Sequence, residues 1–321
     1  MIDDYVKLCT HLGGFSELIQ GSGGNISVKS DTDIIIKSSG RILADTTSTF
    51  GYVICSIKKL QEKLTTKNES TLDCVISGDK NISPSMEVFF HLLPFKYVVH
   101  LHPTFLLKYL CSSNWKTLII PGFSYLHIPY KTPGIDLCST ILEIHNNEQV
   151  LFLQNHGIII CSNIFDEIYM ILDILYNKNN EFTKTRKILD VSQEITNSTF
   201  YIKKCNNILD FYDRYFLPIT PDIKLFLKEM PIFQENTTED IIILLRNYYK
   251  KHSEFPSVIK ILGSTFTLGK SYKHCKCIEE ILESYLSITS EISQNQITSI
   301  DKSLIDSLVN SDKEKHRLNI F

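Results

Sequence analysis

The sequence predicts an α/β sandwich around a mixed, largely antiparallel sheet, because strand-like and helical segments alternate in irregular order. Apolar residues recur at a helical period over residues 3–20, and the pattern stops at Gly21-Ser22-Gly23-Gly24. Alternating runs at 25–29 and 34–37 flank a polar turn, which predicts a hairpin. Hairpins and helical crossovers occur together, so we do not expect a regular doubly wound fold.

The following elements are predicted from the same patterns. Polar residues 64–82 indicate an exposed loop, and Ser85 after Pro84 indicates the cap of a helix that continues through Leu93. Further strands are expected at 52–55, 97–102, 117–120, 149–154 and 157–161, and further helices at 104–111, 134–146 and 164–189.

The C-terminal part of the chain predicts a smaller α+β extension. Polar, irregular residues 190–208 separate it from the preceding pattern, so we expect one domain over 1–195 and an extension or subdomain over 196–321. Its elements are expected to be a helix at 238–251, a β-like run at 258–268, a helix at 273–287 and a charged, solvated helix end at Asp312–Arg317. His274-Cys275-Lys276-Cys277 has spacing unsuited to zinc, and packing is the favoured interpretation.

Composition restricts the classes of protein. With 321 residues and 43% hydrophobic content the chain can bury a real core, and its net charge of -3 provides no basic field for nucleic acid or an anionic membrane. The N-terminus is acidic rather than signal-like, and no apolar run approaches the roughly 20 residues of a membrane span. We therefore expect a cytoplasmic protein. Nine cysteines without a CxxC pair indicate reduced, mostly buried thiols.

A metal site is predicted from three histidines. In His100-Leu101-His102 the period of two along a strand puts both imidazoles on one face, although two half-buried histidines at a strand end would look the same. His156 lies in a polar turn between two apolar strands, where it could reach a neighbouring strand or simply bond to backbone. Three neutral imidazoles with an open fourth position form the usual catalytic zinc arrangement.

Glu87 is the candidate acid/base residue. It lies shortly before the first histidine, and a carboxylate near a divalent ion can move protons. Alternatively, it is an ordinary glutamate of a first helical turn, which the helix dipole favours. His91, one helical turn further on, could orient Glu87 or simply pack.

An anion site is the third prediction. Asn25, at the end of the glycine run, offers a side-chain amide donor, and Lys37-Ser38-Ser39-Gly40 offers hydroxyls, a small residue and a cation. Ser85 is a third contributor. Plain turn chemistry is the alternative for each segment taken alone.

Taken in order, these segments resemble the class II aldolase/adducin head family over roughly residues 5–190. The matching elements are Gly24-Asn25-Ile26-Ser27, Ser39-Gly40, Pro84-Ser85-Met86-Glu87 with His91, His100-Leu101-His102-Pro103 and Asn155-His156-Gly157. The resemblance implies a three-layer αβα sandwich, a homotetramer, and one Zn²⁺ per chain on His100, His102 and His156. It also implies Glu87 as the acid/base residue, and Asn25, Ser39, Gly40 and Ser85 as phosphate ligands. Weaker likenesses continue at Thr220-Pro221-Asp222 and at Glu314-Lys315-His316-Arg317.

Two departures from the family pattern affect phosphate recognition. Met86 stands where the aldolases commonly have a second serine, and Lys37 stands where they have threonine. The resemblance implies a zinc-dependent lyase that cleaves a phosphorylated ketose or related sugar through a metal-stabilised enediolate. A sugar-phosphate 4-epimerase, a dehydratase or a decarboxylase would use the same site. A non-catalytic adducin-like binding module is disfavoured by the complete histidine set, and a dehydrogenase fusion by the absence of a glycine-rich dinucleotide motif in 196–321.

Overall fold

The larger sheet of the structure has eight strands. The computed structural model describes residues 1–79, 81–177, 195–197, 200–205, 208, 211, 215–234, 241–261 and 263–319. In spatial order the strands are β4 (Val75–Gly78), β3 (Tyr52–Ser56), β2 (Asp33–Lys37), β1 (Asn25–Lys29), β5 (Tyr97–Leu101), β8 (Gly157–Ser162), β7 (Val150–Leu153) and β6 (Tyr125–Ile128). All neighbours are antiparallel except β6 and β7. The predicted mixed, largely antiparallel sheet is therefore confirmed.

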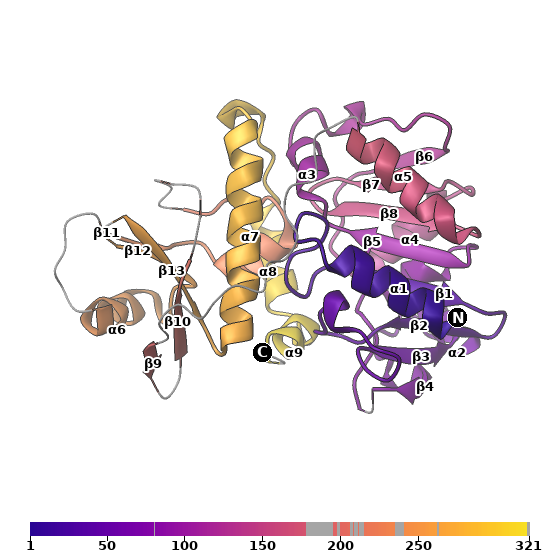
Figure 1. Ribbon diagram of the computed structural model, residues 1–321, viewed down its shortest axis with the longest axis horizontal. Coiled ribbons are helices and arrows are strands. Elements are labelled where there is room, and N and C mark those ends of the chain that lie inside the picture. Colours follow the sequence, from indigo (N-terminus) through magenta and orange to yellow (C-terminus); the bar gives the residue numbers. More distant parts are fainter. Residues whose placement is uncertain are drawn as a thin grey trace.

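Helices cover both faces of this sheet. Alternate residues of one strand enter different cores: Val99 and Leu101 of β5 join one cluster, and Val98 joins the other. The first cluster includes side chains of α1 (Ile2–Gly13), α3 (Thr104–Leu110) and α5 (Phe165–Asn177). The second includes side chains of α2 (Ile57–Thr65) and α4 (Ile135–Ile144). The arrangement is a three-layer αβα sandwich (Figure 1).

A second, smaller sheet forms in the C-terminal region. Its strands in spatial order are β11 (Ile232–Gln234), β12 (Val258–Ile261), β13 (Ser264–Gly269), β10 (Phe200–Lys204) and β9 (Ile195–Asn197). Apolar residues of α6 (Ile241–His252) pack on it. The long helix α7 (Tyr272–Glu291) stands between the two sheets, and α8 (Lys302–Val309) and α9 (Asp312–Asn319) follow it (Figure 1). The α+β character of this region agrees with the sequence, whereas the domain boundary at 195 stays a prediction.

Three predicted elements of the first 100 residues differ in the structure. The expected loop at 64–82 contains a short 3₁₀ helix, Leu72–Cys74, and the edge strand β4. An edge strand exposes one side, so its polar sequence looks like a loop. The expected helix from Ser85 is a 3₁₀ helix, Val88–Leu92, which ends just before Pro94. The expected helix at 3–20 ends at Gly13, where an added Cβ would lie 2.6 Å from the amide nitrogen of Ala44.

The expected strand at 117–120 is also wrong. Trp115–Thr117 is a 3₁₀ helix, and the edge strand β6 forms later, at Tyr125–Ile128, where it pairs with β7. Leu118 and Ile120 are buried without joining a strand, and a short apolar run alone does not distinguish these cases. Residues 178–189 of the expected long helix, most of 190–208, and 238–240 of the next expected helix lie outside the described residues.

All nine cysteines are free and buried, as the sequence predicted. Within the described ranges, no helix is both long and apolar enough to cross a membrane.

Candidate metal centre and adjoining pocket

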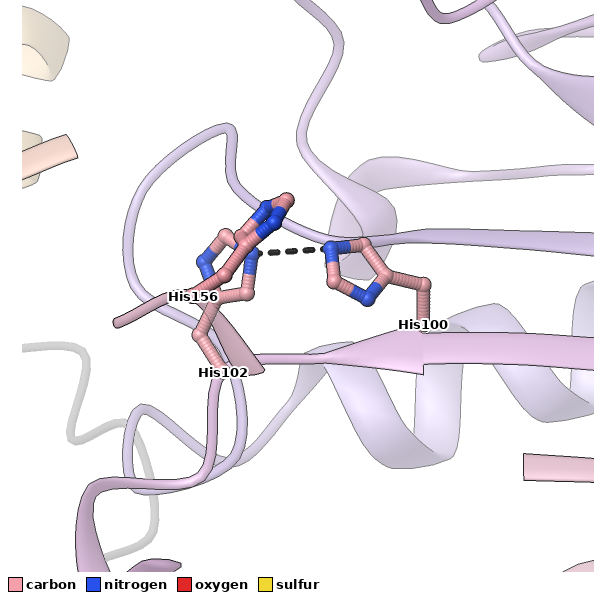
Figure 2. Close-up of side chains that lie close together, drawn as sticks. All are labelled: His100, His102 and His156. Atoms are coloured by element: carbon pink, nitrogen blue, oxygen red, sulfur yellow. Dashed lines mark hydrogen bonds between the residues drawn. The ribbon is translucent and has the colours of Figure 1, made fainter. Parts of the chain in front are cut away.

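The three predicted histidines converge at one edge of the larger sheet. His100 is in β5, His102 follows the end of that strand, and His156 is in the turn between β7 and β8. Because β5 pairs with β8, with His100 opposite Ile159, this turn lies beside the histidine pair. One possible ligand atom of each histidine lies within 4.8 Å of those of the other two, and all three side chains are buried (Figure 2).

The ring orientations suit a metal ion. His100 Nδ1 is 2.9 Å from the carbonyl oxygen of Ile158, so it donates its proton there and leaves Nε2 with a lone pair. That Nε2 is 3.0 Å from Nε2 of His102, whereas two nitrogens on tetrahedral zinc lie about 3.3 Å apart. His156 Nδ1 is buried without a hydrogen-bond partner in the described part of the chain. Burial lowers the pKa of His100 to about 3, which keeps the ring in its neutral, metal-binding form.

The structure explains why asparagine and glycine flank His156 in its turn. Asn155 adopts a left-handed φ of 53°, and its side-chain amide donates to the carbonyl oxygens of Ile219 and Thr298 at 2.8 Å. A Cβ on Gly157 would lie 2.3 Å from the carbonyl oxygen of Leu101. Glycine at this place therefore lets the turn approach β5 closely enough for His156 to meet His100.

Glu87 lies directly beside the histidine cluster. Its Oε2 is 3.5 Å from His100 Nε2, and its Oε1 is 3.2 Å from His156 Nε2. Asn25 Nδ2 donates to Oε2 at 2.7 Å, and His91 Nε2 in turn donates to Asn25 Oδ1 at 2.5 Å. His91 thus reaches Glu87 through Asn25, which is the arrangement of an orienting residue, one of the two roles that the sequence left open.

The groups around the Glu87 carboxyl favour its ionised form. Burial by itself raises its pKa, but the neighbouring His100 and His156 rings and the bond from Asn25 hold the pKa well below its usual range. A carboxylate in this position can accept a proton or contact a cation.

The predicted phosphate residues line one pocket beside the histidines. Asn25, Ser39, Gly40 and Ser85 share this lining with Glu87, His102 and His156. Two backbone hydrogen bonds join the Lys37–Gly40 segment to the segment of Ser85. Ser39 N donates to the carbonyl oxygen of Ser83, and Ser85 N donates to that of Lys37. Asn25 differs from the expectation in one respect, because its amide is already committed to Glu87 and His91.

Lys37 and Met86, the two departures from the family pattern, also line this pocket. The Lys37 ammonium is buried and donates to the carbonyl oxygens of Ser22 and Gly23 at 2.6 and 3.2 Å. Burial and the nearby Arg317 charge lower the pKa of Lys37 to about 7. The lysine thus places a titratable cation in the pocket wall.

Sequence reasoning missed the contribution of the C-terminal region. The charged helix end was expected to be solvated, but Glu314 is 2% exposed and Arg317 forms an ion pair with Asp222 at 2.7 Å. Asp222, Glu314 and Arg317 all line the pocket. A charged residue can be buried when a partner far away in the sequence neutralises it, as Asp222 does for Arg317. The Thr-Pro-Asp turn and the Glu-x-x-Arg spacing were the signals for these residues.

Comparisons with known proteins find similar sequences and similar structures. An uncharacterized oxidoreductase of Bacillus subtilis (strain 168), YuxG, is 26% identical over 179 residues, which are 49% of this chain and 26% of that protein. The chain thus matches about a quarter of this curated relative. The N-terminal class II aldolase domain of a conserved protein from Thermoplasma acidophilum is 22% identical, with a TM-score of 0.47, over 54% of this chain and 90% of that one. A sugar-phosphate aldolase from Thermotoga maritima is 14% identical, with a TM-score of 0.42, over 54% and 91% of the two chains.

The αβα sandwich carries a buried histidine cluster beside a carboxylate at one edge of its sheet. The family model of the class II aldolase and adducin N-terminal domain matches residues 3–177, and the chain belongs to this family.

Proposed function

We propose that the protein is a zinc-dependent lyase that cleaves a phosphorylated ketose or related sugar by a retro-aldol reaction. The single observation that carries this proposal is the Glu87 carboxylate, buried within 3.5 Å of imidazole nitrogens of both His100 and His156. His100, His102 and His156 would hold one Zn²⁺, which as a Lewis acid would polarise the substrate carbonyl and offset negative charge developing at its oxygen.

The protein's own residues would handle the proton and the phosphate. Glu87 is ionised, so it can take the proton from the substrate hydroxyl and return a proton to the carbon at which the bond breaks. Asn25 holds Glu87 in place by its 2.7 Å hydrogen bond. Ser39, Gly40 and Ser85 line the pocket next to Glu87, where they could bind the substrate phosphate. The family resemblance also supports a homotetramer, and the cytoplasmic location expected from the sequence is a further part of the proposal.

The test is metal analysis followed by a substrate screen. The purified protein is analysed for zinc before and after reconstitution, and sugar phosphates are then tested for cleavage, epimerisation, dehydration and decarboxylation. About one zinc per chain and zinc-dependent release of dihydroxyacetone phosphate would support the proposal. Zinc-dependent epimerisation, dehydration or decarboxylation without cleavage would keep the site but replace the reaction. No zinc even after reconstitution would favour a binding module.

Lys37 provides a prediction on anion binding. Because its pKa is about 7, the ammonium is present below that pH and is lost as the pH rises. Sulfate keeps its charge over this range, so we expect its inhibition constant to rise up to about tenfold between about pH 6 and 8. In Lys37→Met the inhibition is expected to be weaker at low pH and nearly independent of pH.

Lys29→Met is the matched control. Lys29 lies on the adjacent strand β1, has a pKa lowered to about 8 by burial, and donates to the carbonyl oxygens of His91 and Leu93 outside the pocket. Its loss should leave the pH dependence of sulfate inhibition as in the wild type. An unchanged sulfate profile in Lys37→Met would exclude Lys37 from the anion site.

A further inference from the structure

Asp222, from the C-terminal region, contacts one of the metal-site histidines. Its Oδ2 lies 3.1 Å from His102 Nδ1, at hydrogen-bonding distance, and both residues are buried. The contact occurs on the side of the ring away from the cluster, since His102 Nε2 is the atom that lies 3.0 Å from His100 Nε2. Asp222 is therefore placed to act on His102 from outside the histidine cluster.

This contact favours one of the two ring nitrogens of His102 for a metal. A carboxylate beside Nδ1 favours the tautomer with its proton on that nitrogen, so Nε2 keeps its lone pair. The carbonyl oxygen of Ile158 has the same effect on His100, whose Nδ1 it meets at 2.9 Å. Both rings are thus prepared to present Nε2 to a common point.

Arg317, from α9, holds Asp222 in this position. One terminal guanidinium nitrogen donates to Asp222 Oδ1 at 2.7 Å, which leaves Oδ2 facing His102. The other terminal nitrogen is 3.3 Å from both carboxylate oxygens of Glu314, and Nε donates to Ser22 Oγ at 3.1 Å. The guanidinium thereby connects α9, the turn at Asp222 and the glycine segment before β1.

The glycine segment leaves the space that the contact needs. A Cβ on Gly23 would lie 2.8 Å from Asp222 Oδ2 and 3.0 Å from His102 Nδ1. A larger residue would therefore push the carboxylate and the ring apart. The glycine segment and α9 thus both contact the His102–Asp222 pair, although they are distant from each other in sequence.

We propose that Asp222 and Arg317 are positioning residues of the metal centre, through which docking of α9 is coupled to metal affinity. The inference rests on the proposed function in that it takes His102 as a zinc ligand. Asp222 acts by orienting His102, and Arg317 acts by orienting Asp222. Because such coupling is reciprocal, zinc binding also stabilises the docked position of α9.

Zinc affinity of Asp222→Asn, measured on the full chain by competition with a chelator, is the first test. The amide removes the charge but keeps the shape of the side chain. We expect zinc to bind roughly 10- to 100-fold more weakly, which is the usual effect of losing a hydrogen-bond partner of a metal-bound histidine. The visible spectrum of the cobalt-substituted protein should change as well, because it reports the ligand arrangement. Glu279→Gln is the control: it removes another buried carboxylate of the C-terminal region, paired with Lys203 at 2.9 Å, and should keep wild-type zinc affinity.

Arg317→Met gives a second test, in which His102 and Asp222 themselves are not substituted. We expect a smaller loss of zinc affinity, about tenfold or less. In the wild type, amide hydrogen exchange in α9 should slow when zinc is added, and this difference should disappear in Arg317→Met. If Asp222→Asn does not fold, these two measurements on Arg317→Met decide the question.

The outcomes separate this inference from the proposed function. Wild-type zinc affinity and an unchanged cobalt spectrum in both variants would overturn the inference while leaving the zinc site in place. A wild-type protein that binds no zinc would overturn both.

Discussion

Replacement of His100 by alanine is expected to abolish zinc binding at micromolar metal and, with it, sugar-phosphate turnover. Loss of a direct ligand should weaken zinc binding by more than the roughly 10- to 100-fold effect of losing a hydrogen-bond partner of a ligand. His100 Nε2 is central to the cluster, because it lies 3.0 Å from His102 Nε2 and 3.5 Å from Glu87 Oε2. Elemental analysis and chelator competition measure the effect, and circular dichroism verifies that the variant is folded.

His127→Ala is the matched control for this prediction. His127 is another histidine of the same sheet, in β6, but it stacks on Phe152 with ring centroids 5.2 Å apart and is absent from the pocket lining. It should keep one zinc per chain. Full zinc occupancy in His100→Ala would remove His100 from the proposed metal centre.

Glu87→Gln is expected to keep zinc and lose turnover. Glutamine preserves the size of the side chain and an oxygen that can accept from Asn25, but it cannot take up a proton at neutral pH. General acid/base catalysis typically contributes about 10²- to 10⁴-fold, so kcat should fall by that order while zinc stays bound. Steady-state kinetics on the zinc-loaded variant provide the measurement.

Glu143→Gln, an exposed change in α4, should behave as wild type in the same assay. If Glu87→Gln turns over at the wild-type rate with zinc bound, Glu87 is not the proton-transfer residue. If Glu87→Gln loses zinc instead, its carboxylate acts as a ligand, which its distances to His100 and His156 would also permit.

The sequence predicted the parts of the site that depend on local patterns. A strand repeats every two residues, so His100 and His102 had to share a face wherever β5 lay in the sheet. The Asn155-His156-Gly157 turn needs a left-handed residue and a close backbone approach, and asparagine and glycine supply both. The convergence of these elements with Glu87 followed from the family resemblance rather than from the residues alone.

Elements without a strong local pattern were less predictable. Edge strand β4 exposes most of its residues, so its sequence looked like a loop. The apolar run 117–120 looked like a strand, although the strand at that edge is β6. In both cases pairing with a neighbouring strand, which is a tertiary property, decided the outcome.

The sequence by itself therefore determined the mixed α/β layering and, with the family resemblance, singled out the three histidines, Glu87 and the segments of Asn25, Ser39 and Ser85 that line the pocket. Only the tertiary structure decided that Lys37 lies buried in the pocket wall, that Asp222 contacts His102, and that Glu314 and Arg317 line the same pocket. The physical reason is that burial of a charge depends on its partners. Arg317 contacts Ser22 and Asp222, which are distant in sequence, so no local pattern could show that Glu314 and Arg317 are withdrawn from solvent.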